Sequence, residues 1–300
     1  MVLGIDIGGT NIKFGIVDDS YKIVKKFSIK TPKEKEDTEV VADIITKARS
    51  IYNEIPFKSI GIGSPGKIDT QNGVCITAAN LPYNNTPIVK MFEDSFEMPV
   101  TIENDGACAV YGELYAGAGK KYDNFIMLTI GTGIGGGIVI NGNPYTGETN
   151  LAGEFGHMTI NFDGPECMCG NKGCFESYGS VTALINQTKK YIEQYPDSLL
   201  ANMGAEQVTG KTAFDAAQAG CPAGMEVVDT YIGYLAYGIT NILRAFEPQA
   251  VILGGAISNE GDNLLIPLKE KLQINCKTKI EISGLGNNAG IIGAVCKCLK

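Results

Sequence analysis

Residues 3–17, LGIDIGGTNIKFGIV, contain two apolar strand patterns joined by a glycine-rich turn. Apolar residues dominate 3–7 and 12–17, and Gly8 and Gly9 supply the backbone freedom that a tight turn between strands needs. A third strand pattern, residues 23–29, follows the polar stretch Asp18-Asp19-Ser20. The pattern therefore predicts a meander of three strands at the start of the chain.

The same arrangement recurs about 120 residues later. FIMLTI at 125–130 is followed by a predicted turn GTGIGG at 131–136, a strand GIVI at 137–140 and the hairpin residues 141–143. A helical pattern follows each copy, at 38–54 and at 181–191. The recurrence predicts two related lobes of the α/β class.

Further helical patterns lie outside these two copies. They span residues 105–116, 212–219, 225–246, 263–272 and 290–299, and an apolar strand at 250–253 precedes Gly254-Gly255. The last helix is rich in small residues, so close packing on a sheet is expected. We expect a small α/β domain of residues 1–117 plus 289–300 and a large α/β domain of residues 118–288.

Composition and charge restrict the class of protein. The 300 residues are 44% hydrophobic, which is enough for a large core, and the formal net charge is -8. Nucleic acids and anionic membrane surfaces attract basic proteins, so neither is an expected partner. We expect no targeting peptide, and the sequence contains no apolar run near the roughly 20 residues that span a bilayer. A cytoplasmic protein is expected.

Four soft metal ligands are close together in the second half of the chain. His157 is the sole histidine, and ten residues later the sequence reads CMCGNKGC at 167–174. Three thiols and one imidazole complete the closed tetrahedral shell of a structural zinc ion. A buried cysteine cluster or a disulfide knuckle are the alternatives, although an odd total of nine cysteines favours reduced thiols. The spacing predicts Zn²⁺ on His157, Cys167, Cys169 and Cys174.

Two segments only partly match known nucleotide-binding loops. GIGSPGK at 61–67 nearly matches a Walker A loop, but Ile68 stands where a magnesium-binding Ser or Thr is required, and Pro65 lacks a backbone donor. GTGIGG at 131–136 fits the dinucleotide-binding pattern literally, but a strand rather than a helix is predicted after it. Both interpretations are therefore rejected.

Two glycine-rich turns remain, DIGGT at 6–10 and GTG at 131–133. Glycine lets backbone amides approach phosphate oxygens, and the hydroxyls of Thr10 and Thr132 add donors. The carboxylate of Asp6 is a ligand type suited to magnesium. Either turn alone could be an ordinary hairpin, whereas the repeated pair favours phosphate binding between the lobes.

Over nearly its whole length, the chain resembles the ROK family of bacterial sugar kinases and repressors, within the actin, Hsp70 and hexokinase superfamily. The resemblance is carried by DIGGT (6–10), GSPG (63–66), END (103–105), GTGIGGG (131–137), EFGH (154–157), CMCGNKGCFE (167–176), GG (254–255) and AGIIG (289–293). It implies a two-lobed actin-like ATPase fold, also described as ribonuclease H-like, with duplicated βββαβα units and an interlobe cleft.

The resemblance also implies roles for individual residues. Asp105 is the implied catalytic base, although its position before an apolar helix equally suits an N-terminal helix acid. Implied sugar contacts are Gly63, Pro65, Asn80, Asn104, Asp105, Glu154, His157 and Glu176. Implied ATP contacts are Asp6, Gly8, Gly9, Thr10, Asn11, Lys13, Gly131, Thr132, Gly133, Gly254 and Gly255. Without the family, Glu154 and Glu176 could be solvated surface charges.

The implied activity is Mg²⁺- and ATP-dependent phosphorylation of a hexose, with glucose as first choice. Kinases of N-acetylmannosamine, N-acetylglucosamine, fructose or allose would share the same motifs. A sugar-sensing repressor is less expected, because such proteins carry a DNA-binding segment before the first strand, which here starts at Val2. A noncatalytic zinc-stabilised binding module is a third option. Family members are often dimers, so a homodimer is possible.

Overall fold

A computed structural model describes residues 1–78, 81–148, 151–272 and 277–300. The chain divides into two compact units, Met1–Lys120 with Asn287–Lys300, and Lys121–Gly286. Among the helices in the described ranges, none has the length and apolar character needed to cross a bilayer.

The first unit is built on a five-stranded sheet of order β3-β2-β1-β4-β8. Its first three strands are β1 (Val2–Ile7), β2 (Asn11–Val17) and β3 (Ile23–Lys30), and they pair antiparallel, which confirms the predicted meander. Strands β4 (Ile60–Ser64) and β8 (Val100–Asn104) continue the sheet parallel to β1. Neither β4 nor β8 was among the predicted strands.

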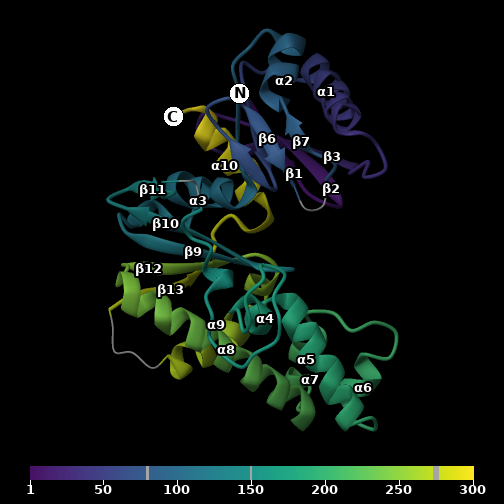
Figure 1. Cartoon of the computed structure of the whole chain (residues 1–300), viewed down its shortest axis with the longest axis vertical. Coiled ribbons are helices and arrows are strands. Elements are labelled where there is room, and N and C mark those ends of the chain that lie inside the picture. The colour runs from purple at the N-terminus through teal and green to yellow at the C-terminus, as the bar shows by residue number, and fades with distance from the viewer. Residues whose placement is uncertain (79–80, 149–150, 273–276) are drawn as a thin grey trace. The chain divides into compact units, whose positions relative to one another are not determined.

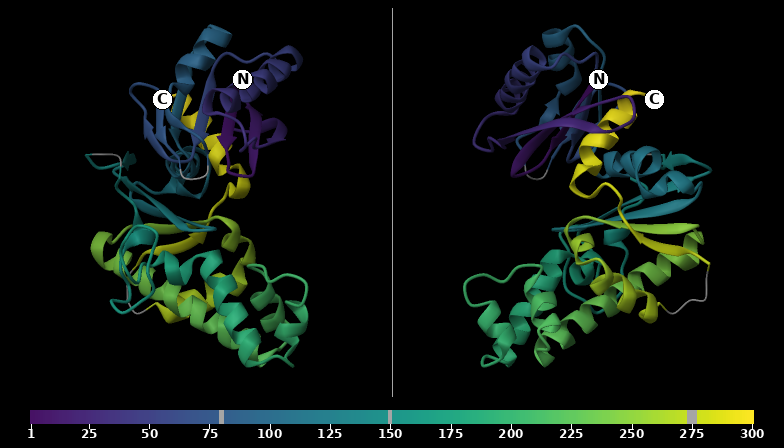
Figure 2. Two further views of the ribbon diagram at one scale, coloured as in Figure 1. Left: turned by 45° about the vertical axis from the view of Figure 1, so that its right-hand side comes forward. Right: turned by 180° about the vertical axis from the view of Figure 1, so that it is seen from behind.

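Helices cover both faces of this sheet. α1 (Asp37–Glu54) and α2 (Ile88–Phe96) pack on one face, and α10 (Ala289–Cys298) packs on the other, beside α3 (Asp105–Ala116) (Figure 1). A small separate sheet contains β5 (Lys67–Asp69), β6 (Val74–Thr77) and β7 (Asn84–Thr86). The C-terminal helix α10, yellow in both views of Figure 2, therefore lies among N-terminal elements.

Glycines allow α10 to lie directly on the sheet. A Cβ atom on Gly4 of β1 would lie 2.5 Å from the Ile291 carbonyl oxygen, and one on Gly61 of β4 would lie 2.1 Å from the Ala294 carbonyl oxygen. On its other side, α10 meets α3, where a Cβ on Gly293 would lie 1.6 Å from the Cys108 carbonyl oxygen. The expected close packing of this small-residue helix is confirmed.

This packing makes Gly293 intolerant of a side chain. Gly293→Ala should lower the free energy of unfolding by about 1–3 kcal/mol, because the obstructing atom is backbone and cannot rotate away. Gly233→Ala is the matched control: Gly233 is also helical, with open space where its Cβ would be, so alanine should be neutral or stabilise by up to about 1 kcal/mol. Urea unfolding measures both changes, and a fully stable Gly293→Ala variant would contradict this packing.

The second unit repeats the topology of the first. Its sheet has the order β11-β10-β9-β12-β13, with β9 (Phe125–Ile130), β10 (Ile134–Ile140) and β11 (Asn143–Tyr145) antiparallel. Strands β12 (Ala250–Gly254) and β13 (Lys279–Ile282) run parallel to β9. The duplication inferred from the sequence is confirmed.

One boundary differs from the prediction. β10 begins at Ile134, so the turn contains only residues 131–133, and Gly135 and Gly136 pair with β9 instead. A Cβ on Gly136 would lie 2.4 Å from the Phe155 ring. Gly136 therefore makes room for the short 3-10 helix η2 (Phe155–His157), and neither glycine belongs to the turn.

The helices of the second unit are α4 (Glu176–Gly179), α5 (Val181–Gln194), α6 (Leu199–Met203), α7 (Thr212–Gln218), α8 (Pro222–Phe246) and α9 (Asp262–Lys271). α8 and α9 lie along the second sheet (Figure 1), and Leu235 and Ile239 of α8 share one apolar core with Leu128 and Leu253. α8 begins three residues before the predicted start because Pro222 is well suited to the first helical turn. Shorter 3-10 helices are η1 (Ala118–Lys121), η3 (Ala256–Glu260) and η4 (Gly286–Asn288).

Candidate active site

The carboxyl ends of β1, β4 and β8 align at one edge of the first sheet. The strand register places Asp6 opposite Gly63, and Gly63 opposite Glu103. Asp6, the turn at 63–66 and the Asn104-Asp105 pair therefore leave the sheet together. Open α/β sheets bind ligands at this edge, outside the carboxyl ends of their parallel strands.

Asn104 fixes the start of helix α3. Its side-chain oxygen accepts hydrogen bonds from the backbone N–H groups of Gly106 (2.9 Å) and Ala107 (3.2 Å), as an N-cap does. Its side-chain nitrogen donates to the carbonyl oxygen of Gly66 at 3.0 Å. Asn104 therefore joins the turn at 63–66 to α3 and determines where the next residue, Asp105, begins the helix.

Asp105 lies at the start of helix α3. It is the first residue of α3, and one of its carboxylate oxygens accepts from the Gly106 N–H at 2.9 Å; the residue keeps accessible surface, although surrounding protein atoms partly desolvate its carboxylate. Desolvation raises the pKa of Asp105, the Gly106 N–H lowers it, and the negative charge of Asp6 raises it again, so the net shift is upward. An accessible carboxylate with a raised pKa is suited to accept a proton.

The first glycine turn lies beside Asp6. The Asp6 carboxylate is 3.4 Å from the Lys13 ammonium, and a Cβ on Gly290, in the first turn of α10, would lie 2.8 Å from its carboxyl carbon. Thr31 secures the turn by donating from its hydroxyl to the Gly8 carbonyl oxygen at 2.6 Å, and Thr10 is exposed. The turn therefore presents exposed groups next to a half-buried acid.

The second glycine turn is held from two sides. The Val181 N–H donates to the Gly131 carbonyl oxygen, and the Thr182 hydroxyl donates to the Thr132 carbonyl oxygen, both at 2.8 Å. On the other side, the Ile134 N–H donates to the Glu176 carboxylate at 2.9 Å. A Cβ on Gly133 would lie 2.1 Å from that carboxylate, so a side chain there would displace Glu176.

Glu176 lies at the turn between β9 and β10, and Gly255 lies against the end of β9. The sequence grouped Glu176 with the sugar contacts, and the structure adds its bond to the turn of the predicted ATP group. Gly255 has a φ of 84°, and a Cβ there would lie 2.4 Å from the Ile130 carbonyl oxygen. Its conformation and this close approach both require glycine.

The four predicted metal ligands form one cluster. Their ligand atoms lie within 4.8 Å of one another, with 3.7 Å between the Cys167 sulfur and the His157 Nδ1 and 3.6 Å between the Cys169 and Cys174 sulfurs. A tetrahedral zinc ion separates such ligands by about 3.5–3.8 Å. All three cysteines are free thiols, so the structure does not contain the disulfide alternative. The donor set and spacing fit zinc.

The loop carrying these cysteines is folded by its own backbone. Isolated bridges join Thr159 to Cys174 and Glu166 to Lys172, and the Cys167 N–H donates to the Asn171 carbonyl oxygen at 2.8 Å. Gly173 has a φ of 65°, and a Cβ there would lie 1.6 Å from the Asn161 carbonyl oxygen. The cluster geometry is therefore set by local sequence.

His157 connects the cluster to Glu154. Its Nδ1 faces Cys167, and its Nε2 lies 3.8 Å from the Glu154 carboxylate.

Burial, followed by contacts with the neighbouring sulfurs, raises the pKa of the Cys174 thiol to about 12. A bound cation would reverse that effect by stabilising the thiolate.

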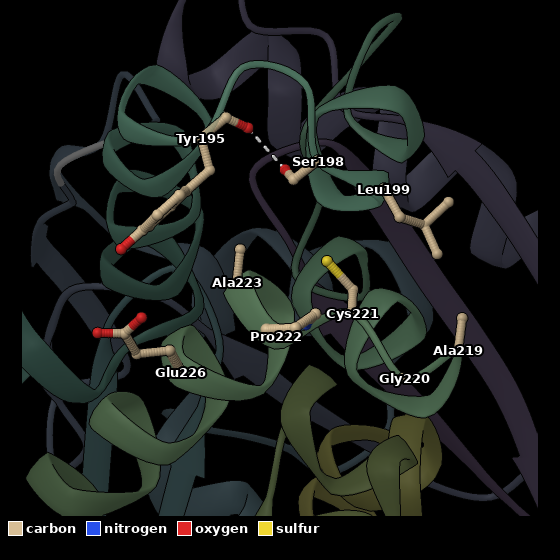
Figure 3. Close-up of a pocket in the computed structure, with 9 residues that line it drawn as sticks. All are labelled: Tyr195, Ser198, Leu199, Ala219, Gly220, Cys221, Pro222, Ala223 and Glu226. Atoms are coloured by element: carbon tan, nitrogen blue, oxygen red, sulfur yellow. Dashed lines mark hydrogen bonds between the residues drawn. The ribbon is translucent and has the colours of Figure 1, made fainter.

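One predicted site residue has no structural counterpart to describe. Asn80, a predicted sugar contact, lies outside the described residues. A cavity of about 460 Å³ lies elsewhere, at the ends of α5, α6, α7 and α8, lined by residues including Tyr195, Leu199, Cys221 and Glu226 (Figure 3). It contains none of the predicted site residues, so we do not assign the active site to it.

The sequence analysis missed one ion pair next to Asp105. Glu103 of β8 lies 3.2 Å from Lys297 of α10. Glu103 was quoted only as part of a motif, and nothing in the local sequence around Lys297 marks it as the partner. The pair can be recognised only once α10 is known to pack against β8 and α3.

Known proteins are similar to this chain over nearly its whole length. The model of the ROK family matches residues 2–299. The glucokinase of Halalkalibacterium halodurans is 34% identical over 305 aligned positions, covering 97% of this chain and 92% of that protein. The xylose repressor of Bacillus subtilis is 32% identical, covering 97% of this chain and 75% of that protein.

A similar solved structure is the ROK family glucokinase from Streptomyces griseus in complex with glucose and AMPPNP. It superimposes with a TM-score of 0.84 at 31% identity, covering 98% of this chain and 97% of that chain. Together with the duplicated α/β topology and the motifs at the strand ends, these matches establish that the chain belongs to the ROK family.

Proposed function

We propose that this protein is an ATP-dependent sugar kinase that transfers the γ-phosphate of ATP to a hydroxyl group of a hexose, with glucose as the preferred substrate. The single observation that carries the proposal is Asp105, an accessible carboxylate with a raised pKa at the aligned strand ends of the first unit. Similarity to glucokinases supports the choice of sugar.

Asp105 is the proposed general base. Phosphoryl transfer depends mainly on alignment and on charge stabilisation, and a carboxylate facing the attacking hydroxyl supplies alignment and accepts its proton. Asn104 supports this role because it caps α3 and so orients the first helical residue. The turn at Gly63 and Pro65 is proposed to border the sugar.

ATP is proposed to contact both glycine turns. Backbone amides and the hydroxyls of Thr10 and Thr132 are donors for phosphate oxygens, and Lys13 adds a positive charge. Asp6 supplies carboxylate oxygens of the kind Mg²⁺ prefers. The remaining proposed nucleotide contacts are Gly8, Gly9, Asn11, Gly131, Gly133, Gly254 and Gly255.

Glu154, His157 and Glu176 are proposed to bind sugar hydroxyls, together with Asn80. We propose that zinc is held by His157, Cys167, Cys169 and Cys174, with no open coordination position. A zinc ion bound there would have a structural role, because ligation through Nδ1 would fix the ring angle of His157 and leave Nε2 as the proton-bearing nitrogen. His157 can then donate to a sugar hydroxyl.

A coupled ADP-release assay tests the proposed function. Purified protein with ATP and Mg²⁺ is supplied with glucose, fructose, allose, mannose, N-acetylmannosamine or N-acetylglucosamine in turn. We expect sugar-dependent ADP release that is fastest with glucose. A faster rate with an N-acetylhexosamine would change the assigned substrate but leave the proposed kinase activity intact. No ADP release with any sugar would refute the kinase activity.

Sugar-dependent regulation is the second candidate, favoured by the similarity to the xylose repressor. A regulator binds sugar without turning over ATP. Calorimetric titration with glucose and with xylose separates the two functions, because sugar binding without ADP release would support regulation.

The raised pKa of Asp105 predicts the pH dependence of catalysis. The base must be ionised, so kcat/KM for the sugar should fall as the pH drops through the pKa of Asp105. Because desolvation and Asp6 raise this pKa, the fall should occur above the ordinary aspartate value of 3.8. Asp6→Asn removes one raising charge and should move the fall to lower pH, even though the rate itself decreases. A fall centred at or below 3.8 would contradict this assignment.

A further inference from the structure

A partly buried ion pair includes Glu103, which is two residues before the proposed base in the sequence. The Glu103 carboxylate is 3.2 Å from the Lys297 ammonium, and their side chains are only 10% and 31% exposed. Glu103 is two residues before Asp105 and ends β8 with Asn104, whereas Lys297 belongs to the last turn of α10.

Both partners make further contacts that join three elements. The other Glu103 carboxylate oxygen accepts from the Asn104 N–H at 2.9 Å. The Lys297 ammonium donates to the Tyr111 hydroxyl of α3 at 3.3 Å and lies 5.1 Å from the centre of its ring. The pair therefore links the end of β8, the middle of α3 and the end of α10.

Helix α10 also lies against Asp6, the acid proposed to bind magnesium. Its first turn lies against Asp6 through Gly290, and its middle lies against the α3 backbone through Gly293. Asp6 and the β8–α3 junction are therefore backed by the same helix. A shift of α10 along its axis would therefore change the packing around both Asp6 and Asp105.

Stability alone gives a weak reason for this pair. Burying two charges costs desolvation energy that their attraction roughly offsets, and well-packed apolar residues of the same volume often stabilise a protein as well or better. The pair does, however, favour one arrangement of β8, α3 and α10, because moving a partly buried charge away from its partner leaves that charge uncompensated. That property matters where a reacting group must be held accurately.

We propose that Glu103 and Lys297 are positioning residues for Asp105. Through Asn104 and α10 they hold the first turn of α3 in the register that aims the Asp105 carboxylate at the sugar hydroxyl. Neither residue contacts a reacting atom. The inference rests on the proposed function, since it assumes that Asp105 is the base.

The test replaces the pair with uncharged side chains of similar size. In the double variant Glu103→Gln, Lys297→Met no charge is left unpaired, so folding is expected even where the single variant Lys297→Met unfolds. We expect kcat to fall about 10–100-fold with KM for sugar and for ATP little changed, because misplacement of the base affects the transition state and not substrate binding.

Several measurements separate positioning from loss of structure. The kcat value is divided by the fraction of sites that bind sugar in calorimetric titration, and circular dichroism and thermal unfolding confirm the fold. Lys90→Met is the matched control, since it removes an exposed Lys90–Asp94 pair 3.0 Å apart and should leave kcat unchanged.

The outcomes are distinct. A folded double variant with normal kcat per binding site overturns this inference and leaves the proposed kinase intact. A parallel loss of sugar binding and kcat also overturns it, because that pattern indicates a general structural role. A wild type that phosphorylates no sugar overturns both proposals.

Discussion

Replacing Asp105 with asparagine should lower kcat for sugar phosphorylation about 10²- to 10⁴-fold, the usual contribution of a general base. Asparagine keeps the oxygen that accepts the Gly106 N–H, so α3 should still begin at residue 105. It cannot take up the proton of the sugar hydroxyl. The variant therefore separates the catalytic role of Asp105 from its role as an N-terminal helix acid.

Sugar and ATP affinities, measured by calorimetry, should change little in Asp105→Asn. Asp37→Asn is the control, because Asp37 is also an acid in the first turn of a helix, α1, and accepts from the Thr86 hydroxyl at 2.6 Å. It should retain the wild-type rate. If Asp105→Asn also retained the full rate, Asp105 would be only a helix acid and the base would have to be sought elsewhere.

Replacing Cys169 with serine should release the metal and weaken sugar binding about 10–100-fold, the usual cost of disturbing the groups around a metal site. Cys169 is exposed, so its loss leaves little cavity. His157 would lose the constraint on its ring, and Glu154 with it, since the two side chains lie 3.8 Å apart. ATP affinity should be nearly unchanged.

Elemental analysis should find about one zinc ion per wild-type chain and much less in Cys169→Ser. Cys221→Ser provides a control in the same unit: Cys221 caps α8, where serine is a favoured residue, and should keep metal and sugar binding. Equal losses of sugar and ATP affinity in Cys169→Ser would instead indicate unfolding, and a metal-free wild type would refute the zinc site.

Features encoded by neighbouring residues were predictable from the sequence. The meander at β1–β3, its repeat at β9–β11 and the cysteine cluster each depend on short-range patterns of apolar residues, glycines or thiols. Helix α3 has the predicted bounds, because Asn104 caps it and the apolar pattern ends before Gly117. These parts of the fold and site need little tertiary information.

Features set by packing between distant segments were not predictable. The segment of β4 was compared with a Walker A loop, which was rejected, and its Gly63 was assigned to the sugar pocket, but no strand was predicted there. The structure shows that Gly61 accommodates α10, which comes from the other end of the chain. The bond from the Ile134 N–H to Glu176 and the Glu103–Lys297 pair likewise join distant residues. No local pattern encodes them.

The central claim is that this protein phosphorylates a hexose with ATP and that Asp105 accepts the proton of the attacking hydroxyl. The most direct measurement is phosphorus NMR of a reaction containing the protein, glucose, ATP and Mg²⁺, run in parallel with Asp105→Asn. We predict a growing sugar phosphate monoester signal with matching ADP in the wild type, and almost none with the variant. ATP that stays intact with wild-type protein and glucose, or equal product from both proteins, would contradict the claim.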